Sequence, residues 1–153
     1  MALHAECARM YEKARQAGQK TLRACAARHV DGYVPVLDDL VDTGGVLAIH
    51  RLGQREIPLS RIVGTSHVSR ARAFSADFMP LQGVNTEFAG KWIRLCQAQT
   101  EEGLRDPIQV YEYMWRYYVA EGNKRVSLLK YLGAFSYQAE ISRMIPEWDD
   151  GNA

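Results

Sequence analysis

The residues best suited to bind an anion are four consecutive ones, Gly122, Asn123, Lys124 and Arg125. The run before them, 117–120, is β-branched and aromatic and predicts a strand. The run after them has apolar residues at helical spacing as far as Gly133 and predicts a helix. A helix that starts directly after a glycine turn presents unpaired N–H groups and a partial positive charge, so an anion can bind there.

The pair Lys124 and Arg125 strengthens this interpretation. The helix dipole favours acidic side chains in a first turn, so two cations in that position oppose local stability and suggest a ligand. The alternative is an exposed pair that is only solvated, because Gly-x-Lys-Arg is far less specific than a full P-loop signature. Both interpretations stay open at this point.

Composition indicates a single globular domain. The chain has 153 residues, 47% of them apolar, and a formal charge of +1, which gives no overall indication of a nucleic-acid-binding protein. The three cysteines include no Cys-x-x-Cys pair, and no histidine lies at metal-ligand spacing from them, so we expect a reduced, cytoplasmic protein without a metal site. We expect neither a membrane span nor an export signal.

The N-terminal residues 1–45 are expected to form a helical extension packed on the domain. Residues 3–28 have a loose apolar stripe and predict a helix that bends or breaks at Gly18. Residues 1–29 carry six basic groups against two acidic ones. These basic groups either face nucleic acid or a partner, or cover the outside of a packed helix.

The middle of the chain predicts two strands and a long irregular stretch. Residues 46–49 and 55–62 are strand-like with a turn at 52–54, and Pro58 indicates an edge strand or a strand end. Residues 64–81 show no sustained period, and long loops in compact domains are often functional. Arg70 and Arg72 in this stretch either reach a phosphate as bidentate donors or form surface pairs.

The C-terminal half predicts a helix, a hairpin and a last strand. Asn85 or Thr86 caps a helix that runs to about Glu102, with Trp92 in the core. Strands are expected at 108–111, 117–120 and 137–142, and an acidic tail or linker at 147–153. Five aromatic residues in this region either pack on the sheet or form a stacking platform for bases: Tyr111, Tyr113, Trp115, Tyr117 and Tyr118.

Three segments appear in an order that resembles a known superfamily. They read EIPLSRI at 56–62, EGLRDPIQV at 102–110 and YVAEGNKRVS at 118–127. The ordered set is similar to the ParB/sulfiredoxin superfamily, a bacterial-type domain. The resemblance implies an α+β fold over residues 46–146, with a small mixed β-sheet and packed helices.

The resemblance also implies a nucleotide, CTP or ATP with Mg²⁺, at the Gly122 turn. Gly122 and Asn123 would supply backbone N–H groups, and Lys124 and Arg125 would supply charge to the phosphates. Ser127 would direct its hydroxyl to phosphate or metal, and Arg70 or Arg72 would close over the ligand.

Departures from the family patterns separate the possible functions. Sulfiredoxins carry a catalytic cysteine where this chain has Asn123, so sulfinate reduction is not expected. Partition ParB proteins need a helix-turn-helix that these residues lack, so DNA is expected only through another domain or partner.

Two classes of function remain. One is a regulatory or DNA-associated nucleotide-binding module, which could form an oligomer. The other is a phosphotransferase or NTPase in which Glu121 holds Mg²⁺ or accepts a proton. A nuclease ranks last, because no carboxylate cluster is visible.

Overall fold

The structure is a computed structural model and describes residues 2–41 and 45–146. Within these residues, five strands form one mixed sheet in the order β1-β5-β3-β4-β2. The outer pairs are β1 with β5, antiparallel, and β4 with β2, parallel, while β3 runs parallel to β5 and antiparallel to β4. The strands are β1 (Val46–Pro58), β2 (Ile62–Thr65), β3 (Ile108–Tyr113), β4 (Arg116–Glu121) and β5 (Ser136–Pro146).

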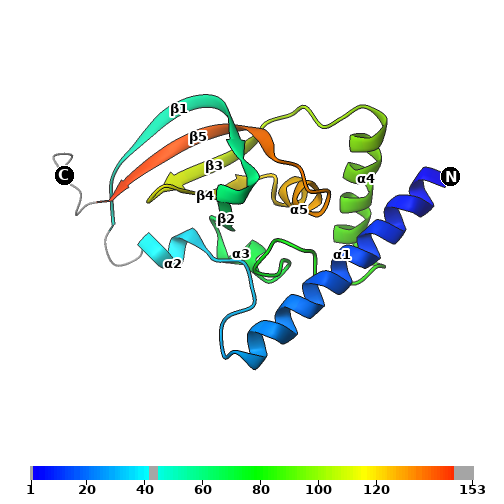
Figure 1. The fold of residues 1–153 in the computed structure, drawn as a ribbon. Helices are drawn as coiled ribbons and strands as arrows, with labels where there is room; N and C mark the ends of the chain where they lie inside the picture. Colours follow the sequence, from blue (N-terminus) through cyan, green and yellow to red (C-terminus); the bar gives the residue numbers. More distant parts are fainter. Residues whose placement is uncertain (1, 42–44, 147–153) are drawn as a thin grey trace.

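The helices lie mainly on one side of this sheet. In Figure 1, α5 lies between the strands and α4, and α1 crosses α4 on the outside of the molecule. The helices are α1 (Ala2–Ala27), α2 (Leu37–Val41), α3 (Val68–Ala71), α4 (Glu87–Glu101) and α5 (Asn123–Tyr131), with a short 3-10 turn at Leu59–Arg61. The predicted α+β class, with a small mixed sheet, packed helices and an N-terminal helix, is therefore confirmed.

The core is built in layers from this arrangement. Val126 and Leu129 of α5 pack on one face of the sheet, against apolar residues of β3, β4 and β5. A second cluster joins α1, α4 and α5 around Trp92, which is fully buried as predicted. On the other face, Leu37 of α2 packs against Tyr113 and Tyr118. The start of α5 is thus held between the sheet and α4.

Two local predictions were wrong. Helix α1 is continuous through Gly18. Because Gly18 has no side chain, the chain at Pro80 and Leu81 can pack closely against the helix there, and this packing offsets the low helix propensity of glycine. A Cβ on Gly18 would lie 2.9 Å from both the Pro80 carbonyl oxygen and Leu81 Cδ2. The turn expected at 52–54 is a bulge within the single long strand β1, where Gly53 has a positive φ of 83°.

Other boundaries agree with the sequence analysis. Pro58 ends β1, which is an edge strand, and Thr86 caps α4 by accepting a hydrogen bond from the Ala89 N–H at 3.2 Å. The predicted hairpin forms between β3 and β4, and its two turn residues, Met114 and Trp115, both have positive φ. The tail expected at 147–153 lies outside the described residues. None of the described helices combines the length and the apolar character that a membrane crossing needs.

Candidate functional site

The turn between β4 and α5 has the geometry of an anion site. Strand β4 ends at Glu121, Gly122 adopts a left-handed conformation with φ 107°, and α5 begins at Asn123. A Cβ on Gly122 would lie 2.6 Å from Ile108 Cγ2, so both the backbone angle and the space require glycine. Within the described chain, no side chain at the N-cap satisfies the first N–H groups of α5. These groups are therefore available to a ligand.

A cavity of about 590 Å³ opens at this helix start, between α3, α4 and α5. Five cationic side chains line it against one acidic side chain, Glu121. The cations are Arg70 of α3, Lys91 and Arg94 of α4, and Lys124 and Arg125 of α5. A cavity with this charge balance favours an anionic ligand, and its volume lies in the range of small-molecule sites.

Lys124 is half-buried in this positive environment. Its Nζ lies 4.9 Å from the centre of the Phe88 ring, a cation–π distance. Burial lowers the pKa of Lys124, and the nearby charges of Arg70 and Lys91 lower it further, although Glu87 opposes them. Lys91 is itself paired with Glu87, at 3.1 Å between Nζ and Oε1. An anion in the cavity would relieve the repulsion that these cations impose on Lys124.

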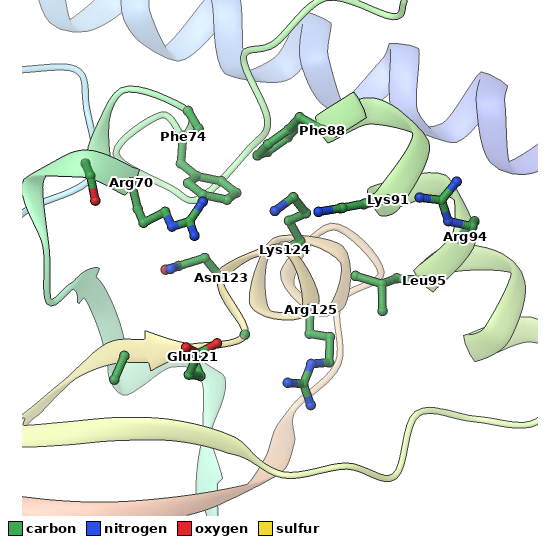
Figure 2. Close-up of a pocket in the computed structure, with 14 residues that line it drawn as sticks. Arg70, Phe74, Phe88, Lys91, Arg94, Leu95, Glu121, Asn123, Lys124 and Arg125 are labelled. Carbon is green, nitrogen blue, oxygen red and sulfur yellow. The ribbon is translucent and has the colours of Figure 1, made fainter. Parts of the chain in front are cut away.

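Asn123 contributes a buried oxygen without a partner. The residue is 9% exposed, and its Oδ1 makes no hydrogen bond within the part of the chain that the structure describes. In Figure 2 its side chain points toward Arg70, while Lys91 extends toward Lys124. A buried acceptor that lacks a donor is costly, so a ligand N–H or O–H, or a shift of Arg70, would stabilise it.

Arg125 is placed differently from Lys124. Its Nη1 donates hydrogen bonds to the carbonyl oxygens of Asp106, at 2.6 Å, and Pro107, at 3.2 Å. Figure 2 shows its guanidinium on the side of α5 away from Lys124. Arg125 therefore anchors the connection before β3, and its free charge is less available to a ligand than the sequence analysis expected.

Two further candidates lie away from the cavity. Ser127 is fully buried, and its Oγ accepts a hydrogen bond from Trp92 Nε1 at 3.1 Å. Arg72 places its guanidinium 4.5 Å from the centre of the Tyr33 ring and does not line the cavity, unlike Arg70. The structure thus separates the two arginines and puts Ser127 in the core.

Glu121 lines the cavity and is exposed. Among the described residues, no ion pair involves its carboxylate, so it does not order the turn by pairing with Lys124 or Arg125. Residues 2–41 and 45–146 contain no group of three or more His, Cys, Asp or Glu side chains that would form a metal site by themselves. A Mg²⁺ ion would therefore have to be held by the Glu121 carboxylate together with phosphate oxygens of a ligand, which is a usual arrangement for that ion.

Sequence reasoning missed the contribution of α4. Lys91 and Arg94 lie three residues apart, and Phe88 precedes Lys91 by three, so all three share one side of the helix. This spacing was visible in the sequence, but the packing of α4 beside α5 is what directs that side into the cavity. The aromatic cluster of β3 and β4 does not line the cavity: Tyr113, Tyr117 and Tyr118 are buried in the sheet.

Comparisons with known proteins are sparse. No protein-family model and no curated protein matches the chain. Among solved structures, the chain is similar to the crystal structure of sulfiredoxin from Arabidopsis thaliana, with 23% identity and a TM-score of 0.41. The match covers 57% of this chain and 82% of that one. A likeness at this level carries no argument about family, ligand or activity.

Proposed function

We propose that the cavity at the start of α5 binds the phosphate chain of a nucleotide, CTP or ATP with Mg²⁺, and that the domain serves as a nucleotide-responsive regulatory or DNA-associated module. The observation that carries the proposal is the coincidence of an uncapped helix start with five cations and one acid around a single cavity. Helix starts and converging cations each favour phosphate, and here both border the same cavity, although Arg125 is engaged with the carbonyl oxygens of Asp106 and Pro107.

Each side chain has a role in this proposal. The N–H groups at the start of α5 donate to phosphate oxygens, and Lys124 supplies the nearest charge. Arg70 closes over the phosphates from α3 with a bidentate guanidinium. Phe74 and Phe88, which also line the cavity, offer apolar surface to the sugar or base. Glu121 would hold Mg²⁺ together with phosphate oxygens.

Calorimetric titration with CTP, ATP and ADP, each with Mg²⁺, tests the binding. We expect saturable one-to-one binding of at least one nucleotide, and a loss of about tenfold or more in affinity for Lys124→Met. Arg72→Gln is the control, because it removes a cation that lies outside the cavity. Equal affinity of Lys124→Met and the native chain would overturn the assignment of the site.

A second candidate function, phosphoryl transfer or nucleotide hydrolysis, is favoured by the position of Glu121. Among the described residues it is the one acidic residue that lines the cavity, and it directly precedes the glycine turn. A carboxylate beside a bound phosphate can position Mg²⁺ or accept a proton from a hydroxyl. In this case Glu121→Gln abolishes turnover, as measured by phosphate release, while nucleotide affinity remains; turnover unchanged in the variant would exclude this role.

A further inference from the structure

The outward face of α1 is a straight stripe of cations. Arg9, Lys13, Lys20 and Arg23 are all exposed and follow one another at intervals of four, seven and three residues. At 100° per residue these intervals place the four side chains within an arc of about 80°. The buried side chains of α1 point the opposite way, into the core: Cys7, Tyr11, Ala14 and Gly18. The helix therefore packs with one face and presents the basic stripe with the other.

The stripe keeps an excess of positive charge, although the exposed Glu6 lies near Arg9 and Lys13 on the same helix. Among the described residues, no ion pair involves any of its four cations. The nearest pairing on α1 is Arg15 with Glu12, at 2.7 Å, and neither residue belongs to the stripe. The chain as a whole has a charge of only +1, so this is a local concentration of charge on one helix face. Such a face attracts a polyanion.

The dimensions of the stripe fit a duplex. Arg9 and Arg23 are separated by roughly 21 Å along the helix axis, at 1.5 Å per residue. A duplex carries one phosphate charge per about 1.7 Å of its axis, so four phosphates can be contacted over this length. The major groove of DNA is about 12 Å wide and admits an α-helix. In Figure 1, α1 lies on the outside of the molecule and crosses α4 on its inner side.

A membrane surface fits less well. Helices that lie on membranes insert a face of large apolar side chains between the headgroups. The apolar side chains of α1 are engaged with α4, and none of the exposed large hydrophobic residues of the described chain belongs to α1. The face that remains is polar and cationic, which suits a phosphate backbone.

We propose that the outward face of α1 binds the phosphate backbone of duplex DNA without sequence preference. This site lies on a different element from the nucleotide cavity and does not depend on it. It differs from the expectation that DNA would be reached only through another domain or partner, since the contact is made by this chain itself.

Fluorescence anisotropy with a labelled random-sequence duplex of about 24 base pairs tests the proposal over a range of salt concentrations. Four phosphate contacts predict a log–log salt slope of about −3.6, a loss of about 150-fold in affinity between roughly 50 and 200 mM salt. The double variant Lys13→Gln/Lys20→Gln should reduce the slope by about 2. Arg9→Gln/Arg23→Gln, at the ends of the stripe, should have a similar effect.

The control removes two exposed cations elsewhere, Arg51→Gln/Arg55→Gln on β1, and should keep the slope of the native chain. Nucleotide titration of the Lys13/Lys20 variant should be unchanged, which separates this proposal from the cavity. The proposal is overturned by the absence of DNA binding at low salt, by equal losses in control and stripe variants, or by binding to phosphatidylserine vesicles in preference to DNA.

Discussion

The cavity at the start of α5 and the outward face of α1 both gather cations, but their surroundings differ. In the cavity, Lys124 is partly buried against Phe88 and close to other cations, and the N–H groups of a helix start face the same space. On α1 the cations lie in a row, each exposed, on the middle of a long helix.

This difference in surroundings determines which kind of ligand each region can recognise. In a concave, partly desolvated site, charges interact strongly and backbone groups add direction, so a small anion of definite shape is favoured. On a convex, solvated face each contact is weak and screened by salt, so only a ligand with many regularly spaced charges is held. Substitutions in and around the cavity should therefore leave the α1 face unchanged.

The largest effect is expected for Gly122→Ala. The left-handed backbone conformation alone costs about 1–3 kcal/mol for a non-glycine residue, and the contact with Ile108 adds to it. Urea denaturation should show a clear loss of stability. The fraction of the variant that still folds should bind nucleotide poorly. Gly103→Ala is the control, because Gly103 also has a positive φ, 80°, but a Cβ there meets no atom within 4 Å. Equal losses in the two variants would remove the argument for close packing at Gly122.

Ser127→Ala should reduce stability and leave the site intact. The substitution leaves the buried Trp92 Nε1 without its acceptor, which costs about 1–3 kcal/mol. Nucleotide affinity of the folded variant should equal that of the native chain. Ser69→Ala, at an exposed serine that lines the cavity, should change stability by no more than about 0.5 kcal/mol. A loss of nucleotide affinity in a stable Ser127→Ala protein would show that Ser127 takes part in ligand binding.

The variants Arg70→Gln and Arg72→Gln compare two arginines of one segment. Arg70 lines the cavity, and Arg72 lies outside it. Arg70→Gln should weaken nucleotide binding about tenfold, or 1.4 kcal/mol, because it removes a bidentate donor. Arg72→Gln should stay within about twofold of the native chain, since Arg72 stacks on Tyr33 outside the cavity. Isothermal calorimetry measures both. A larger loss of affinity for Arg72→Gln than for Arg70→Gln would show that Arg72, and not Arg70, reaches the ligand.

The smallest effect is a pH dependence due to Lys124. Its lowered pKa means that the ammonium releases its proton at lower pH than an ordinary lysine, so charge is lost as pH rises. Nucleotide affinity should therefore fall as the pH rises, starting at a lower pH than the titration of an ordinary lysine would give. Lys124→Arg should flatten this profile, because a guanidinium stays charged throughout. Parallel profiles for the two proteins would exclude Lys124 as the titrating group.

The sequence predicted the local backbone structure around the candidate site well. The β4–Gly122–α5 turn was found because a β-branched run, a glycine and a helical period are each visible within a few residues. Thr86, Gly103 and Pro58 likewise mark boundaries through local backbone chemistry. The α+β class followed from these elements together with the three family-like motifs.

The rest depended on packing between distant segments. Lys91 and Arg94 reach the cavity only because α4 lies beside α5, which their spacing does not reveal. Ser127 belongs to the second turn of α5, on the side that faces Trp92, and a motif gives its position in the chain without its orientation. Gly18 lies in a continuous helix because of its contact with the chain near residue 80, which local propensity cannot indicate.

The most direct measurement of the central claim is a ¹H–¹⁵N correlation spectrum of the labelled domain during titration with ATP or CTP and Mg²⁺. The account predicts that the backbone amides of Asn123, Lys124 and Arg125 shift first and farthest, together with those around Arg70, and that α1 is unaffected. Largest shifts elsewhere in the sheet or on α1, or no shift at any nucleotide concentration, would contradict the assignment of the phosphate site to the start of α5.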